Sequence, residues 1–334
     1  MTRALITGIT GMVGSHLADY LLEHTDWQIH GMLRWRSPLD NIQALIPLAN
    51  RGERVRFHYG DLRDAQAMRD VVQHSRPHYV FHLAAQSYPQ TSFSSPCDTI
   101  DTNTNGTVRL LEALKDIVPD ALIHVCSSSE VYGRTSKELT PIKEDCPFHP
   151  ASPYAISKIG ADMVAQNYAQ AYGMRIMVTR MFTHTGPRRG DVFAESSFAK
   201  QIAMSEASGG PHLIRHGNLE SIRTIADVRD AVRAYYMLMT VNPQPGAVYN
   251  IGGAYTCPVS HILDTLIVYS RRPYQFISDA SRMRPIDADN QVPDCSKFME
   301  RTGWKPELLF EQTMHDLLNY WRERVRSGQN FLTR

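Results

Sequence analysis

The chain has 334 residues, of which 43% are hydrophobic and 21% charged, an ordinary composition for a globular protein with a large core. Its formal net charge of +1 argues against nucleic acid or an anionic membrane as the main partner. No stretch approaches the ~18 apolar residues of a membrane span, and the N-terminus lacks the layout of a cleavable signal. We therefore expect a soluble cytoplasmic protein.

The cysteines and histidines give no indication of a metal site. Five cysteines are scattered along the chain, and neither they nor the fourteen histidines show paired metal-ligand spacing. We expect free thiols in a reducing cytosol and no structural metal. The cysteines are Cys97, Cys126, Cys146, Cys257 and Cys295.

The first half of the chain alternates apolar, β-rich runs with helical patterns. Strands are predicted at 3–8, 27–34, 55–61, 79–85, 121–129 and 175–181, and helices at 12–24, 64–75, 102–116 and 154–173. Such alternation with right-handed crossovers predicts an α/β fold, a doubly wound parallel sheet of the Rossmann type with helices on both faces.

After about residue 183 this rhythm breaks. Polar stretches containing glycine and proline are interleaved with isolated helices, and residues 310–325 form an amphipathic pattern. We expect residues 1–182 to form a cofactor-binding Rossmann domain, to which strands and helices around 224–250 return. Residues 183–334 are expected to form mainly a smaller, loop-rich substrate-binding lobe over the carboxyl edge of the sheet.

A glycine triplet follows the first predicted strand and opens the first helix. In "TGITGMVGSHL" these residues are Gly8, Gly11 and Gly14. Glycines let the backbone turn tightly and approach a pyrophosphate, which then lies on the helix N-terminus. The spacing G-x-x-G-x-x-G indicates the short-chain dehydrogenase/reductase class, although a triplet alone is also typical of a plain tight turn.

The end of the second predicted strand bears on the choice of cofactor. A free ribose hydroxyl would favour an acid there, but the chain offers Arg34, Trp35, Arg36 and Ser37, and no acid until Asp40. Two arginines and a serine suit a 2′-phosphate, so NADP is predicted ahead of NAD. The alternative is a solvated basic loop.

Two further strand ends are predicted to reach the cofactor. "YGDLRD" places Asp61 and Leu62 at the tip of the third strand, where a carboxylate can accept from an adenine amino group. "HLAAQS" places the small residues Ala84 and Ala85 where the cofactor backbone would pass.

A tyrosine and a lysine in "YAISK" are predicted to be catalytic. Tyr154 and Lys158 are four residues apart and therefore share one face of a helix. A phenol loses its proton near pH ~10. A lysine ammonium one turn away would stabilise the phenolate and make the tyrosine a usable base.

With these motifs in this order, the chain resembles the extended short-chain dehydrogenase/reductase family of nucleotide-sugar enzymes over nearly its full length. In "HVCSSSEVYG" the resemblance implies that Ser128 hydrogen-bonds the sugar hydroxyl and relays its proton to Tyr154. Ser128-Ser129-Glu130 is close to the "T-S-E" of GDP-mannose 4,6-dehydratases, whose glutamate acts on C5. Some related GDP-4-keto-6-deoxymannose reductases also carry a glutamate there.

Later segments are similar to the same subfamily, among them "PRRGDVF", "GNLESIRTIADVRD", "RMRPIDAD" and "TGWKP". The resemblance implies that Arg223 and Arg284 clamp a substrate diphosphate, for which the planar arginine fork is well suited. It further implies that Asp287 contacts the nucleotide and Ser87 the hexose. The remaining implied contacts are His184 for the cofactor, and Arg189, Asn218 and Thr183, which replaces a family asparagine, for the substrate.

The resemblance implies a lyase that converts a GDP-hexose, with GDP-mannose first, to its 4-keto-6-deoxy form by internal hydride transfer. The alternatives are a GDP-manno-heptose 4,6-dehydratase, a GDP-4-keto-6-deoxymannose reductase, a C4-epimerase and a cofactor-binding protein with a dead site. Family members also pair as dimers or tetramers through the helix at 154–173, which here presents Ile156, Ile159, Met163 and Tyr168.

Overall fold

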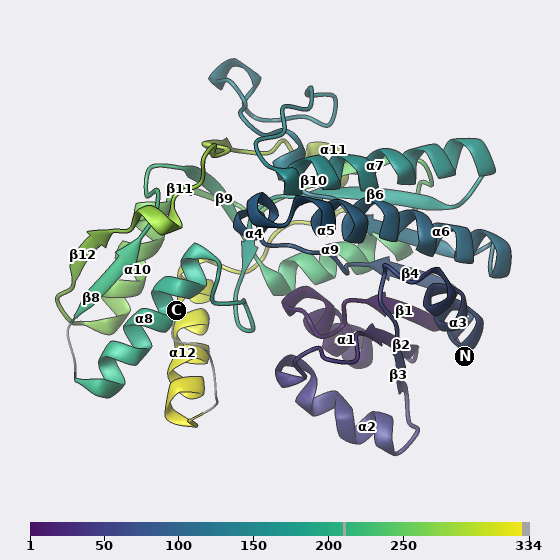
Figure 1. Ribbon diagram of the computed structural model, residues 1–334, viewed down its shortest axis with the longest axis horizontal. Helices are drawn as coiled ribbons and strands as arrows, with labels where there is room; N and C mark the ends of the chain where they lie inside the picture. Colours follow the sequence, from purple (N-terminus) through teal and green to yellow (C-terminus); the bar gives the residue numbers. More distant parts are fainter. Residues whose placement is uncertain (210–211, 329–334) are drawn as a thin grey trace.

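The computed structural model of the chain describes residues 1–209 and 212–328, and its centre is a seven-stranded sheet in which every pair of neighbours is parallel (Figure 1). This confirms the predicted doubly wound α/β fold. Six strands fall within the predicted ranges, and the seventh comes from the second half of the chain. From edge to edge the strands are β10 (Val248–Ile251), β6 (Ile176–Met181), β5 (Leu122–Cys126), β4 (Tyr79–His82), β1 (Arg3–Thr7), β2 (Gln28–Leu33) and β3 (Val55–Tyr59).

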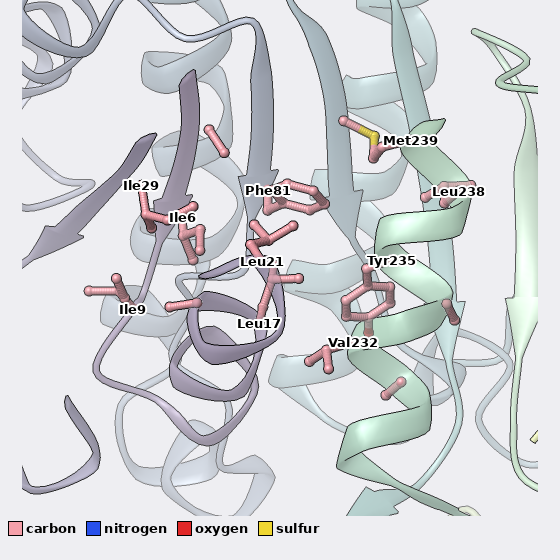
Figure 2. Packing of buried hydrophobic residues seen from close by; sticks show 14 of the residues in the cluster. Ile6, Ile9, Leu17, Leu21, Ile29, Phe81, Val232, Tyr235, Leu238 and Met239 are labelled. Atoms are coloured by element: carbon pink, nitrogen blue, oxygen red, sulfur yellow. The ribbon is translucent and has the colours of Figure 1, made fainter. Parts of the chain in front are cut away.

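Helices cover both faces of this sheet. Successive residues of a strand point to opposite faces, so Leu5 and Ile6 of β1 belong to two different clusters, and both are fully buried. Figure 2 shows the cluster on the Ile6 face, where side chains of two helices meet β1, β2 and β4. These helices are α1 (Met12–His24) and α9 (Val228–Thr240). The opposite face is covered by α3 (Ala65–Ser75), α6 (Gly106–Ile117) and α7 (Pro153–Tyr172).

A smaller lobe lies beside the sheet, at the left of Figure 1. Its expected isolated helices pack on one another around a core of their own, to which Phe310, Met314, Leu317 and Trp321 contribute the predicted apolar stripe. The helices are α8 (Ala194–Ser208), α10 (Val259–Ser270) and α12 (Phe310–Arg326). The short strands are β7 (His184–Thr185), β8 (Leu213–His216), β9 (Ile222–Asp227), β11 (Tyr255–Pro258), β12 (Gln275–Ser278) and β13 (Asn290–Gln291).

Several element boundaries differ from the predicted ones. The strand predicted at 121–129 ends at Cys126, so the three serines lie beyond it. The helix predicted at 102–116 begins with a π-helical turn, η2 (Asp101–Asn105), before α6. Four helices of five to seven residues were not predicted, because they are too short to show a periodic pattern. They are α2 (Ile46–Asn50), α4 (Pro89–Ser94), α5 (Pro96–Ile100) and α11 (Ser296–Thr302).

The helix α7 is partly exposed. Ile156 and Met163 are 51% and 43% exposed, whereas Ile159 and Tyr168 are half-buried against the rest of the molecule. Neither α7 nor any other helix in the described ranges is both long and apolar enough to cross a membrane.

A buried histidine ties the centre of the sheet to the helices. The Thr7 hydroxyl accepts from the amides of Leu83 and Ala84 and lies 2.9 Å from Nδ1 of His82, so its own proton is donated to that nitrogen. Nε2 of His82 then donates to the Thr107 hydroxyl at 3.0 Å. His82 is therefore held as a neutral imidazole, and burial lowers its pKa to about 3.

Stability is expected to fall as the pH drops below about 6.5. Burial lowers the pKa of His124 to about 3, and burial together with neighbouring His58 lowers the pKa of His30 to about 4. In the unfolded chain these imidazoles, with that of His82, take up protons below about pH 6.5. Each buried neutral histidine should therefore cost about 2 kcal/mol of stability between pH 6.5 and pH 5.

Urea unfolding between pH 5 and pH 8 measures this slope. The His30→Gln variant has no titrating group at that position. Its loss of unfolding free energy between pH 6.5 and pH 5 should therefore be smaller by the contribution of one histidine. A free energy of unfolding that stays constant down to pH 5 would contradict the assignment of neutral imidazoles.

Candidate active site

A cavity of about 530 Å³ lies at the carboxyl edge of the sheet between the strand ends and the lobe. Loops that follow parallel strands meet at this edge, where ligands of such sheets bind. The structure brings most of the predicted site residues together here. Those that line the cavity are Gly8, Gly11, Gly14, Ala85, Ser87, Ser128, Glu130, Tyr154, Lys158, Thr183, His184, Arg189, Asn218, Arg223, Arg284 and Asp287.

Arg34 and Arg36 lie outside this cavity, exposed at the end of β2. Between them Trp35 is 79% exposed, and its ring meets the ring of Tyr59, the last residue of β3, edge to face at 5.0 Å. The segment therefore presents two cations and two aromatic rings at adjacent strand ends.

Three other predicted cofactor contacts have protein partners. The carboxylate of Asp61 accepts from Nε and Nη2 of Arg63, which lowers the pKa of Asp61 below its usual range. Leu62 is buried in the core and does not line the cavity. Ala84 packs directly against Gly8.

The glycine triplet forms a tight turn in which Gly8 and Gly14 have no room for a side chain. Gly8 has φ +74°, and a Cβ on it would lie 2.9 Å from the backbone of Ala84. A Cβ on Gly14 would overlap the carbonyl oxygen of Gly8. Strand, turn and helix are therefore in direct backbone contact at the N-terminus of α1. This is the arrangement that a dinucleotide pyrophosphate requires, so the residues present fit such a cofactor.

Hydrogen bonds fix Tyr154 in the first turn of α7. Ser152 caps the helix by accepting from the amide of Ala155 at 3.0 Å, and Ser157 donates to the Tyr154 carbonyl at 2.7 Å. Asn103 in η2 donates to the Ser157 hydroxyl at 2.8 Å. These bonds fix the backbone at Tyr154, whose side chain is buried and lines the cavity.

Opposing effects act on the phenol of Tyr154. Burial raises its pKa above the usual range, and a hydrogen bond with Ser128 and the charge of Arg189 oppose that rise. Lys158 lies one turn away on the same helix, as its spacing predicted, but its Nζ donates to the Cys126 carbonyl at 2.7 Å. A buried ammonium needs an acceptor, and the carboxyl end of β5 supplies one.

A chain of charged groups crosses the cavity. Nη1 of Arg284 lies 3.2 Å from Oε1 of Glu130 and 3.4 Å from Oδ1 of Asp287. Asp287 is also paired with Arg223 at 3.2 Å. The predicted C5 base is thus linked to the predicted diphosphate clamp, a contact that no sequence motif indicates.

The cavity has an excess of positive charge. Among its lining residues are six cations and three carboxylates, which favours an anionic ligand. His184 adds no charge, because burial and the nearby charge of Arg189 lower its pKa to about 4 despite the opposing hydrogen bond of its Nδ1 with the Phe182 carbonyl. The cations are Lys158, Arg188, Arg189, Arg223, Arg282 and Arg284, and the carboxylates are Glu130, Glu195 and Asp287.

Sequence reasoning missed several polar residues of this cavity, among them Ser127, Asn41, Arg188 and Ser221. Ser127 lines the cavity, and its hydroxyl is buried without a hydrogen-bond partner among the described residues. Asn41 donates to the Thr10 carbonyl and ties the loop after β2 to the glycine turn. Arg188 pairs with an aspartate of α1 at 2.7 Å, and Ser221 donates to Asp287 at 2.9 Å. Ser127 lies inside a serine run, and Arg188 and Ser221 lie in segments that carry the family resemblance, whereas no local pattern marked Asn41.

Within the described ranges, no group of three or more His, Cys, Asp or Glu side chains is arranged to hold a metal ion.

Comparison with known proteins places these features in one family. Residues 5–317 match the family model described as GDP-mannose 4,6 dehydratase. A relative from Arabidopsis thaliana, GDP-mannose 4,6 dehydratase 2, is 34% identical, with 92% of this chain and 84% of the relative covered. GDP-6-deoxy-D-mannose reductase of Pseudomonas aeruginosa is 30% identical, with 97% and 98% covered.

A solved structure agrees with these sequence matches. RMD of Pseudomonas aeruginosa, complexed with NADPH, superposes with a TM-score of 0.82 at 29% identity, covering 97% of this chain and all of that one.

Proposed function

This chain belongs to the GDP-mannose 4,6-dehydratase family, and on that premise we propose that it converts a GDP-hexose, GDP-mannose first, to the 4-keto-6-deoxy sugar nucleotide. The observation that carries the proposal is the position of Glu130. Its carboxylate lines the same cavity as Ser128, Tyr154 and Lys158. A simple alcohol oxidation needs no second base, whereas elimination across C5 and C6 does.

The cofactor is a nicotinamide dinucleotide, and NADP is the proposed form. When bound, it supplies the acceptor and later the donor of the hydride. Gly8, Gly11 and Gly14 would hold its pyrophosphate, supported by the absence of room for any Cβ at Gly8 and Gly14.

Tyr154 and Ser128 act on the C4 hydroxyl. Ser128 is close enough to Tyr154 to lower the phenol's pKa by hydrogen bonding, so it can pass the hydroxyl proton to the tyrosine. Arg189, whose charge also lowers the pKa of this phenol, stabilises the phenolate. Lys158 holds the carboxyl end of β5, which carries Ser128, against α7.

Glu130 acts on the carbon acid. A ketone at C4 acidifies the neighbouring C5 proton. Glu130 removes that proton, and the C6 hydroxyl takes up a proton and leaves as water. The Ser128 hydroxyl accepts from the Glu130 amide at 3.2 Å in the turn η3 (Ser129–Val131), so relay and base are fixed in one short segment.

The test is to incubate the protein with GDP-mannose, a catalytic amount of NADP and no reductant, and to identify the product by mass spectrometry. The 4-keto-6-deoxy product is expected from the natural chain. Glu130→Gln should lower its formation by about a hundredfold to ten-thousandfold, while solvent deuterium no longer enters C5. Unchanged turnover of this variant would remove Glu130 from the mechanism.

A reductase of a 4-keto-6-deoxy sugar nucleotide is the second candidate. It is favoured by the 30% identity to a GDP-6-deoxy-D-mannose reductase over nearly the full length of both chains. A strict requirement for stoichiometric NADPH with a keto substrate would support this candidate. Parallel incubation with GDP-manno-heptose tests the remaining substrate alternative.

Arg34 and Arg36 are proposed to select NADP over NAD, supported by their exposure at the end of β2. Replacing both by serine removes charge-assisted hydrogen bonds to a 2′-phosphate. NADP affinity is expected to fall about tenfold to a hundredfold, with NAD affinity unchanged. Calorimetry measures both, and Arg51→Ser, at an exposed arginine paired with Glu53, serves as the control. Tighter binding of NAD by the natural chain would contradict the assignment.

Three broader proposals accompany this function. Residues 1–182, with the returning segment 224–250, form the cofactor domain and 183–334 mainly the sugar-nucleotide lobe, of which 210–211 and 329–334 lie outside the described residues. The exposed side chains of Ile156 and Met163 support assembly of α7 into a homodimer or homotetramer. Five free cysteines support a location in the reducing cytoplasm.

A further inference from the structure

The ion pair between Glu130 and Arg284 links two groups that the proposed reaction uses for different purposes. Glu130 follows β5 at the carboxyl edge of the sheet, and Arg284 follows the turn η5 (Ala280–Arg282) in the lobe. Their side chains are only 15% and 25% exposed, so the pair forms inside the cavity rather than in open solvent.

The two carboxylates that share Arg284 depend on it unequally. Asp287 also accepts hydrogen bonds of 2.9 to 3.3 Å from four other groups. The donors are the backbone amide of Ala288 and the side chains of Arg223, Ser221 and Asn218. Glu130 has no other ion-pair partner among the described residues. If Arg284 moves, Asp287 therefore keeps its hydrogen bonds and Glu130 becomes a free carboxylate.

The contacts of Arg284 are also loose. Its Nη1 serves both carboxylates at 3.2 and 3.4 Å, longer than the about 2.7–2.9 Å of strong charge-assisted bonds. The described residues provide no hydrogen-bond partner for its Nε and Nη2. A diphosphate carries more charge than one carboxylate, and its oxygens can accept hydrogen bonds from Nε and Nη2 together.

We propose that Arg284 exchanges partners on substrate binding: it pairs with Glu130 in the free protein and with the diphosphate of the nucleotide in the complex. The exchange deepens the proposed function, on which it rests for the identity of the ligand as a GDP-sugar. Its consequence is that Glu130 is held by a cation until a substrate is present. The base is then released only in a cavity that contains the carbon acid.

Because Glu130 and the diphosphate compete for the Arg284 guanidinium, neutralising Glu130 should raise the affinity for GDP. Glu130→Gln removes the competing charge, so GDP should bind this variant about threefold to tenfold more tightly than the natural chain. In an Arg284→Met background the same substitution should leave GDP affinity unchanged, because the shared partner is gone. Calorimetry with GDP measures all four proteins without any need for turnover.

Two controls separate the exchange from general charge effects. Asp116→Asn removes one negative charge from an exposed pair on α6 and should not change GDP affinity. Guanosine, which has no phosphate, should bind the natural chain and Glu130→Gln equally. Thermal unfolding verifies that each variant is folded, and Arg284→Gln replaces Arg284→Met if the latter is not.

GDP affinity that is unchanged or weaker in Glu130→Gln would overturn the exchange, as would equal tightening in the Arg284→Met background. Failure of the proposed function looks different. In that case GDP-mannose would give no 4-keto-6-deoxy product, while the binding cycle with GDP still showed its coupling.

Discussion

Replacing Tyr154 by phenylalanine is expected to lower kcat by about a hundredfold to ten-thousandfold, the range for loss of a general acid–base group. The substitution removes only the hydroxyl, and the hydrogen bonds that position this residue in α7 are made by its backbone and by Ser152 and Ser157. Binding of NADP and GDP, followed by calorimetry, should therefore remain within about twofold of the natural chain.

Tyr132→Phe is the matched control. The hydroxyl of Tyr132 is also buried, but it donates to Asn250 at 2.7 Å and accepts from Arg180 at 3.0 Å, outside the cavity lining. This variant should lose stability and keep its turnover per folded molecule. Equal loss of turnover in the two variants would show that the effect of Tyr154→Phe is structural.

Asp162→Asn is expected to destabilise the fold by about 3–5 kcal/mol, the cost of breaking a buried ion pair from one side. Asp162 on α7 is fully buried and pairs with Arg180 on β6, which is 5% exposed, at 2.9 Å. The Arg180 guanidinium also donates to Tyr132 and to the Glu144 carbonyl. The amide of asparagine leaves this cation buried without a counter-charge.

Urea unfolding at pH 7 measures the loss. Asp116→Asn breaks an ion pair with Arg69 whose side chains are 44% and 48% exposed, so it should cost no more than about 1 kcal/mol. A loss for Asp162→Asn as small as that of the control would mean that the buried arginine finds other compensation.

Much of the fold was accessible from the sequence because buried parallel strands and amphipathic helices have strong periodic patterns. The six strands of the first half and the stripe of α12 are examples. The short helices α2, α4 and α5 were missed, since five or six residues cannot show a helical period. The π-helical turn η2 was also missed: it depends on Asn103 bridging the end of β4 to α7, a contact between distant segments.

The candidate site was predictable where chemistry depends on local spacing. The glycine turn and the Tyr154–Lys158 pair are of this kind, and the structure brings both to one cavity. Contacts between strand ends and lobe were not predictable, because no local pattern reports which side chain of the lobe faces Glu130. The pairing with Arg284 and the hydrogen bond of Lys158 to a backbone carbonyl emerged only from the folded arrangement.

The place of β10 at the edge of the sheet, beside β6, limits when this protein can fold during its synthesis. A nascent chain released as far as Thr240 contains six of the seven strands of this sheet and α9, yet the edge of β6 still lacks its neighbour. Phe298 and Trp304, which complete the core beside β10, emerge later still. An unpaired strand edge invites wrong pairing. At a synthesis rate of about 5–20 residues per second, several seconds pass before β10, Phe298 and Trp304 have been added to the chain. No single cut separates a cofactor-binding fragment that retains its whole core.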